Sequence, residues 1–214
     1  MERPDYLNKI KDRIKAAKTG SVFVATDFAD IAENAKIGVC LSRLAEEKVL
    51  CRVMRGVYYK PEYSKVLREI IAPAPDAVAH AIARNYGWTI VPCGDTALNT
   101  FGLSEQVPVV WIYVSDGTYK EYSYDSTTIK FKRTANKEIS NLSAKTALVI
   151  QAIKALGKDS INGEVIETIR SQTTAAERKA MLKEAQHATA WIYEVIKRIC
   201  RDSMKRIAGI LSKE

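Results

Sequence analysis

Residues 34–61 constrain the fold of this chain more than any other stretch, because a helical pattern there runs directly into the pattern of a β-hairpin. The helical part carries one apolar stripe, formed by Ile37, Cys40, Leu41 and Leu44. Residues 49–60 are rich in β-branched and aromatic side chains on both sides of Arg55-Gly56, where glycine supplies the positive φ that a tight turn needs. A helix followed by such a wing is the pattern of a winged helix-turn-helix.

The other face of this helix is polar. Lys36, Ser42 and Arg43 lie on it, and Lys36 and Arg43 share one side with Val39. Side chains of these kinds can contact base edges or phosphates when a helix enters the major groove. In the wing, phosphate contacts are expected from Arg52, Arg55 and Lys60. The alternatives are a winged helix that contacts only protein, and ordinary exposed arginines beside a turn.

The residues before this stretch complete the motif. Amphipathic spacing predicts a first helix over residues 5–17, and a short apolar run at 21–24 suits the small strand of a winged helix. Thr26 is a good N-cap for a second helix over 27–32. The third helix is expected over 35–46. Residues 1–61 are therefore predicted to form a DNA-binding domain.

The charge distribution favours nucleic acid as a partner. The net charge is +8, and residues 1–61 contain 12 Lys and Arg against 8 Asp and Glu. Residues 175–214 contain 9 against 5, while residues 62–174 are balanced at 12 against 12. Neutralisation of phosphates supplies most non-specific binding energy. Ordinary solvated lysines are an equally good explanation of the charge alone.

The cysteines predict reduced thiols and no metal site. Cys40, Cys51, Cys93 and Cys200 form no Cys-x-x-Cys pair, and only two histidines accompany them. No apolar run approaches the ~18–20 residues of a membrane span. We expect a cytoplasmic protein that has no cofactor.

Two prolines in Ala72-Pro-Ala-Pro75 give the clearest signal of a domain boundary in the chain, because proline disfavours both helix and central strand. We expect a linker at 62–75, either extended or a short helix, and a second domain over 76–214. This domain begins with a helix at 76–86 that ends at Gly87. The elements expected next are a strand at 88–91, a short helix at 95–101, a strand at 109–114 and a hairpin of 119–124 with 126–132.

The last third of the chain is expected to be helical. Helices are predicted over 144–156 and 163–171, followed by one long basic helix over 175–211 that Thr174 caps. That helix is expected to pack on its own domain, although a membrane or nucleic acid could meet its basic face. The fold class is therefore α/β of the α+β kind: a winged helix-turn-helix and a mixed domain with a small sheet covered by helices.

Several motifs give the chain a family resemblance. Leu41-Ser-Arg-Leu44, Val53-Met-Arg-Gly-Val-Tyr-Tyr59 and Pro61 resemble the N-terminal domain of AbiEi-type antitoxins of type IV toxin–antitoxin systems. Later motifs resemble short AbiEi-like proteins, so that the resemblance covers residues 5 to about 157: Val91–Pro108, Tyr113–Gly117, Phe131–Thr134 and Leu148–Ile153. One departure is Lys48, where the family usually has a glycine that would give a left-handed cap; the lysine would change the angle of the wing.

The resemblance implies a function. A winged helix of this class would bind double-stranded DNA at the promoter of its own operon and repress it, and the second domain would counteract a nucleotidyltransferase-type toxin. It carries over Arg52, Arg55 and Tyr58 as wing residues, and it implies no catalysis. Two alternatives remain. One is a nucleic-acid-processing enzyme that uses Asp116 and Glu121 with Lys130 and Lys132, and the other is a module that binds protein.

Overall fold

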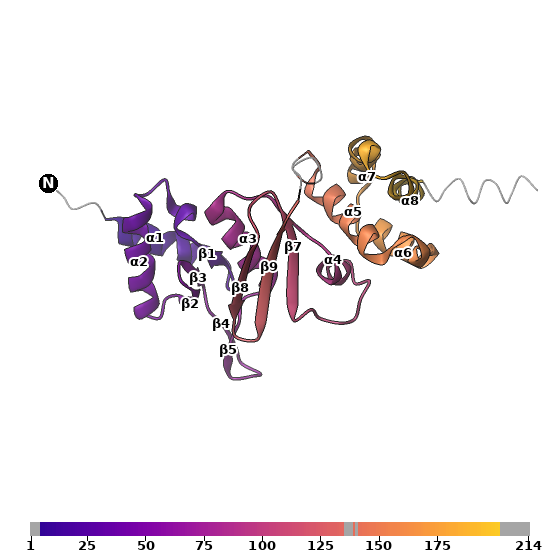
Figure 1. Ribbon diagram of the computed structural model, residues 1–214. Helices are drawn as coiled ribbons and strands as arrows, with labels where there is room; N and C mark the ends of the chain where they lie inside the picture. The colour runs from indigo at the N-terminus through magenta and orange to yellow at the C-terminus, as the bar shows by residue number, and fades with distance from the viewer. Residues whose placement is uncertain (1–4, 135–138, 140, 202–214) are drawn as a thin grey trace, which may run out of the picture. The chain divides into compact units, whose positions relative to one another are not determined.

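The computed structural model describes residues 5–134, 139 and 141–201. This part of the chain contains several helices and several small sheets, which confirms the predicted α/β fold class (Figure 1). The chain divides into two compact units. The first contains Met1–Thr89 and Glu121–Ile129, and the second contains Ile90–Lys120 and Lys130–Glu214. This division differs from the predicted boundary at 62–75.

The first unit opens with the elements of a winged helix. In chain order these are α1 (Tyr6–Ala16), β1 (Val22–Phe23), the 3-10 helix η1 (Ala25–Phe28), α2 (Asn34–Glu46), β2 (Cys51–Met54) and β3 (Val57–Tyr59). The three strands form one antiparallel sheet in the order β1-β3-β2. Val22 pairs with Tyr59 in this sheet, and Arg52 pairs with Tyr58. The arrangement is the predicted winged helix-turn-helix.

The core of the winged helix lies where α1, η1 and α2 meet this sheet. Ile37, Leu41 and Leu44 of α2 are buried, as their spacing predicted. The buried cluster to which they belong consists of Ile10, Ile14, Phe23, Phe28, Ile37, Leu41, Leu44, Leu50 and Tyr58. Each such side chain contributes about 1.5–3 kcal/mol on burial. Packing therefore fixes which face of α2 stays at the surface.

The second helix of the motif is shorter than predicted. Thr26 was expected to cap a helix from Asp27 onward, but it lies inside η1. The backbone N–H of Val24 donates to the Asp27 carboxylate at 2.9 Å, which starts the turn earlier. Asp30 is held by Arg13 of α1 through hydrogen bonds of 2.6 and 2.7 Å. Asp27 and Asp30 were expected to stabilise the first turn of a longer helix through its dipole. Their carboxylates instead bind the Val24 N–H and the Arg13 side chain.

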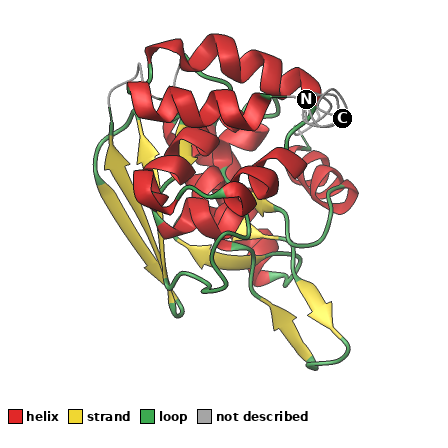
Figure 2. Cartoon of the chain, turned by 90° about the vertical axis from the view of Figure 1, so that its right-hand side faces the viewer, coloured by secondary structure: helices red, strands yellow, loops and turns green. Residues whose placement is uncertain are grey.

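The segment predicted as a linker contains a second hairpin instead. Its strands are β4 (Glu62–Ser64) and β5 (Glu69–Ile71), which form an antiparallel two-stranded sheet. Arg68 closes the turn with a φ of 56°, a conformation in which glycine or asparagine is usual. Because neither residue type occurs there, the local sequence did not indicate a hairpin. Figure 2 shows the hairpin as two strands that project from the other elements of its unit.

Helix α3 (Pro75–Tyr86) follows and packs on the winged helix. Pro75 occupies the first helical position, where its missing N–H removes no hydrogen bond. The helix contacts β1, η1 and β3, and its buried residues are Val78, Ala79, Ala81, Ile82 and Ala83. Gly87, with a φ of 66°, ends it as predicted. The predicted boundary assigned α3 to the second domain. In the structure α3 belongs to the first unit, because it packs on the winged helix.

The sheet of the second unit was largely predicted. Its elements are β6 (Ile90–Pro92), α4 (Asp95–Thr100), β7 (Val110–Ser115), β8 (Lys120–Tyr124) and β9 (Thr127–Arg133). The strand order is β6-β7-β9-β8, and β6 runs antiparallel to β7 with Val91 opposite Val114. Asp125, with a φ of 46°, lies in the turn of the β8–β9 hairpin, where a turn was expected. Most of β8, the turn and the start of β9 belong to the first unit, as Glu121–Ile129.

The remaining helices build an apolar cluster together with Ala97 and Phe101. They are α5 (Ala144–Leu156), the 3-10 helix η3 (Lys158–Ser160), α6 (Gly163–Ser171), α7 (Ala175–Glu184), the 3-10 helix η4 (Ala185–His187) and α8 (Ala190–Cys200). The bounds of α5 and α6 confirm the prediction, because Ser143 and Asn162 cap them through side-chain hydrogen bonds.

The long helix predicted over 175–211 is broken. Thr174 caps α7 as expected, but the chain turns at η4 and starts again as α8. A straight helix of that length would span about 55 Å, whereas the turn lets Ile192, Ile196 and Ile199 pack in the cluster that α5 and α6 also form. This confirms that the apolar stripe packs on its own unit. Residues 202–211 lie outside the described part of the chain.

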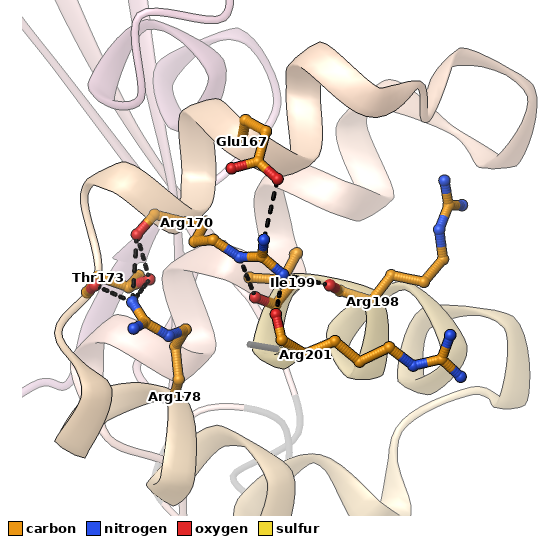
Figure 3. A network of polar contacts seen from close by, with 7 residues as sticks. All are labelled: Glu167, Arg170, Thr173, Arg178, Arg198, Ile199 and Arg201. Carbon is orange, nitrogen blue, oxygen red and sulfur yellow. Dashed lines mark hydrogen bonds and ion pairs between the residues drawn. The ribbon is translucent and has the colours of Figure 1, made fainter. Parts of the chain in front are cut away.

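Arg170 of α6 fixes the end of α8. Figure 3 shows its guanidinium among the last carbonyls of α8 and beside Glu167. It donates to the carbonyl oxygens of Ile199 at 2.8 Å and Arg198 at 2.9 Å, and also to that of Arg201. The final carbonyls of a helix have no partner inside it, so this contact satisfies them.

Candidate nucleic-acid interface

The helix α2 is joined to the wing by a left-handed cap. Lys48 has a φ of 58°, the backbone N–H of Val49 donates to the Leu44 carbonyl at 2.9 Å, and that of Lys48 donates to the Ala45 carbonyl at 3.1 Å. These two bonds define a Schellman motif. Lys48 thus adopts the conformation that a glycine would have supplied, so the cap is present without one.

The exposed face of α2 is formed by Lys36, Val39 and Arg43. Val39 is 70% exposed, and the side chains of Lys36 and Arg43 are 54% and 63% exposed. The Nζ atom of Lys36 lies 3.6 Å from the Glu33 carboxylate. The structure therefore brings the two predicted cations to one accessible face, with an apolar side chain between them along the helix.

The wing presents two arginines. Arg52 is exposed, and its Nε atom donates to the Met54 carbonyl at 3.4 Å. Arg55 and Gly56 form the exposed turn between β2 and β3, and Gly56 has a φ of 80°. This confirms the predicted role of the glycine. The two arginines thus lie on the same hairpin that α2 leads into.

Ser42 and Tyr58 contact each other. Their hydroxyl oxygens lie 2.9 Å apart, and Tyr58 is only 3% exposed. The guanidinium carbon of Arg52 lies 6.0 Å from the centre of the Tyr58 ring. Tyr58 therefore belongs to the core and links β3 to α2, and it offers no ring to a base. Ser42, which is half-buried, has its hydroxyl engaged in the same link.

Lys60 does not extend the basic surface. Its Nζ atom donates to the carbonyl oxygens of Lys15 at 2.7 Å and Ala17 at 2.8 Å. Both carbonyls lie at the C-terminal end of α1, where a cation is favoured by the helix dipole and by unpaired carbonyls. The structure thus gives Lys60 a role in the cap of α1.

An acidic side chain borders the exposed face. The Glu47 carboxylate accepts hydrogen bonds from Lys11 at 3.3 Å and from Arg43 at 3.1 Å. These two cations, Lys11 first, lower the pKa of Glu47 below its usual range. Arg43 therefore shares its charge with an acid at the surface where a phosphate would have to bind. Sequence reasoning missed Lys11, because it lies 36 residues from Glu47 and no local pattern joins them.

The residues of the enzymatic alternative are distributed over the second sheet and its hairpin. Asp116 directly follows β7, Glu121 lies in β8, and Lys130 and Lys132 lie in β9. Within residues 5–134, 139 and 141–201, no group of three or more His, Cys, Asp or Glu residues could share a metal ion. All four cysteines are free thiols, and only Cys93 is buried. This geometry gives the alternative no specific support.

A comparison with protein families identifies the family of the chain. The model of DUF6088, a family of unknown function, matches residues 9–181. The chain belongs to DUF6088. The match to DUF6088 begins within α1 and includes the rest of the winged helix, the β4–β5 and β8–β9 hairpins, α5 and α6. Among curated proteins, no relative of this DUF6088 member is found. None of the helices described for this DUF6088 protein has the length and apolar character required to cross a bilayer.

Proposed function

We propose that this protein binds double-stranded DNA through α2 and the β2–β3 wing and thereby regulates transcription. The observation that carries the proposal is the exposed set Lys36, Arg43, Arg52 and Arg55 on one helix and the hairpin that follows it. In winged helices a helix of this kind enters the major groove, and the wing contacts the backbone beside it.

The contacts of the interface support different roles for its residues. Lys36 and Arg43 can reach base edges or phosphates, because both side chains are more than half exposed and their ion pairs with Glu33 and Glu47 lie at the surface. Arg52 and Arg55 are placed for phosphate contacts. Ser42, Tyr58 and Lys60 hold α1, α2 and the wing together. The binding surface is thus smaller than the set of residues expected from sequence.

The regulated gene and the partner come from the resemblance to AbiEi-type antitoxins. On that basis the bound DNA is the promoter of the protein's own operon, and the protein counteracts a nucleotidyltransferase-type toxin. Co-expression with a nucleotidyltransferase encoded directly downstream tests this second part. Growth that is restored by this protein supports it, and growth that remains inhibited speaks against it.

The experiment that tests DNA binding measures affinity for the upstream fragment and for unrelated DNA over a series of salt concentrations. A preference for the upstream fragment is expected, with log K falling by about 0.9 for each phosphate contact per decade of salt. Replacing Arg55 with alanine should weaken binding to both fragments and reduce the slope by about 1. Replacing Arg43 should also reduce the preference between them.

A matched control removes charge elsewhere. Lys158→Ala combined with Lys179→Ala deletes two exposed cations of the second unit. This variant should retain the affinity and the salt slope of the wild type. Equal, negligible binding of wild type to both fragments would contradict the proposal. It would favour the alternative that the winged helix binds protein.

A further inference from the structure

Val39 is the most exposed of the large apolar side chains on the helices that the structure describes. It is 70% exposed, and Tyr86 of α3 follows at 43%. Ile37 and Leu41, each two residues away, are buried, and two residues turn an α-helix by about 200°. Val39 therefore points directly away from the core that holds α2 in place.

Val39 adds little to the stability of the fold. An apolar side chain stabilises a protein in proportion to the surface that it removes from water, and most of Val39 remains in water. Its branched Cβ also lowers the helix propensity of the position. Isolated apolar residues are common on protein surfaces, so it is the neighbours of Val39 that distinguish it.

Two cations flank Val39 along α2. Lys36 lies three residues before it and Arg43 four residues after it, which are the spacings that bring side chains together on a helix. The side chains of the two cations are 54% and 63% exposed. A polyanion that both cations contact is therefore brought against Val39.

Small residues lie on the other side of Val39. Ala35 precedes it by four residues and Gly38 by one, and Ser42 follows it by three. A Cβ added at Gly38 would have open space around it, and the Ser42 hydroxyl lies 2.9 Å from that of Tyr58. A partner can therefore approach the backbone of α2 closely beside Val39, while the cations contact it on the opposite side.

We propose that Val39 is a specificity-determining residue that contacts the 5-methyl group of a thymine in the major groove. This contact rests on the proposed function, which places α2 in that groove. Base pairs present hydrogen-bond donors and acceptors there, and the thymine methyl is the apolar group among them. An apolar side chain at the centre of the exposed face therefore favours thymine over cytosine, whose amino group would lose water without gaining a hydrogen bond.

The spacing of the three side chains also limits where the thymine lies in the operator. An α-helix rises 1.5 Å per residue, so Lys36 and Arg43 are about 4.5 and about 6 Å from Val39 along the axis. Successive bases of one strand are about 3.4 Å apart. The two cations therefore reach positions one or two base pairs from the thymine, and guanine is preferred where they contact base edges.

The test uses a duplex that the wild-type protein selects from a pool of random sequences. This duplex is made again with 2′-deoxyuridine in place of one thymine at a time, which removes only the methyl group and keeps the pairing with adenine. At the thymine that Val39 contacts, the change should weaken binding by the wild type about three- to fivefold, the loss expected for one methyl group. The other deoxyuridine duplexes should bind as the selected one does.

Two variants assign the effect to Val39. Val39→Ser should bind the thymine duplex and the deoxyuridine duplex equally, because it no longer has an apolar group for the methyl to contact. Val107→Ser is the matched control, since Val107 is 74% exposed and lies between α4 and β7 of the second unit. It should retain the difference that the wild type shows.

The outcomes separate this contact from the proposed function. A wild type that enriches no sequence from the pool would overturn both. A selected duplex whose affinity does not change with any deoxyuridine would overturn the Val39 contact alone. A deoxyuridine effect that persists undiminished in Val39→Ser would also overturn it, because another residue would then contact the methyl group.

Discussion

Arg84 and Asp27 form an ion pair that joins α3 to the winged helix. The Nε and Nη2 atoms of Arg84 lie 2.8 and 3.1 Å from the two oxygens of Asp27, and Nη2 also donates to the Val22 carbonyl at 3.1 Å. Asp27 in turn accepts from the Val24 N–H. One carboxylate therefore organises both the short η1 turn and the docking of a helix 57 residues away.

Because of this ion pair, we expect replacement of Arg84 and replacement of Asp27 to lower the free energy of unfolding by different amounts. Arg84→Ala should lower the free energy of unfolding by about 1 kcal/mol, because the arginine is nearly half exposed and water screens the pair. Asp27→Ala should cost about 2 kcal/mol, since the Val24 N–H also loses its acceptor. Urea unfolding followed by circular dichroism measures both. The double variant should cost no more than Asp27→Ala alone, and additive losses would show that the two residues act separately.

The left-handed cap at Lys48 predicts a stabilising substitution. Lys48→Gly should raise the free energy of unfolding by about 0.5–1 kcal/mol, because glycine adopts a positive φ without steric cost. Lys48→Ala is the matched control and should give no such gain, since alanine keeps the steric penalty. Thermal denaturation distinguishes them, and equal melting temperatures for both variants would contradict the assignment.

Lys60 and Arg55 predict opposite phenotypes although both were expected to contact phosphates. Lys60→Met should destabilise the protein by about 1 kcal/mol, because two carbonyls at the end of α1 lose their donor. It should leave the salt slope of DNA binding unchanged. Arg55→Ala should preserve stability and reduce that slope by about 1. A Lys60 variant that changes the slope as Arg55→Ala does would place Lys60 at the DNA.

Replacement of Glu47 by glutamine should change both the pH dependence of stability and the affinity for DNA. Its pKa is lowered in the folded protein by Lys11 and Arg43, so its contribution to stability is complete above the usual glutamate pKa of about 4.3 and is lost as the pH falls through the lowered value. In Glu47→Gln, stability should therefore fall less steeply on acidification below that range. At neutral pH the same variant should bind DNA more tightly, because Arg43 no longer shares its charge with an acid.

Unfolding measured at several pH values and DNA titration of the same samples check this prediction. Glu46→Gln, on the neighbouring residue of α2, is a control with the same change in charge. An affinity gain of equal size in both variants would mean that net charge and not the Arg43 contact is responsible.

Local signals in the sequence predicted the elements that depend on near neighbours. The apolar spacing of Ile37, Leu41 and Leu44 gave both the extent of α2 and its buried face. Gly56 marked the wing, and Gly87 marked the end of α3, because each position requires a positive φ. The apolar run over 144–156 likewise gave the bounds of α5.

Contacts between distant residues account for what the sequence did not predict. Lys60 carries the same charge as Arg55, and its contacts with Lys15 and Ala17, 45 and 43 residues away, give it a structural role. Arg68 adopts a positive φ without being glycine, so the β4–β5 hairpin had no turn signal. One long C-terminal helix was predicted from a continuous pattern of apolar residues. That pattern does not indicate the break at η4, which lets α8 pack on α5 and α6.

The path of the chain also determines when the winged-helix unit can be completed. The chain leaves this unit after Thr89 and contributes to it again only through Glu121–Ile129. During translation the ribosome therefore makes the whole of β6, α4 and β7 before the last strands of the first unit emerge. A nascent chain that stops before residue 121 has a winged helix but not its finished unit. If α2 and the wing bind the promoter of the protein's own operon, as proposed, they do so from a finished unit only after residue 129 has been synthesised.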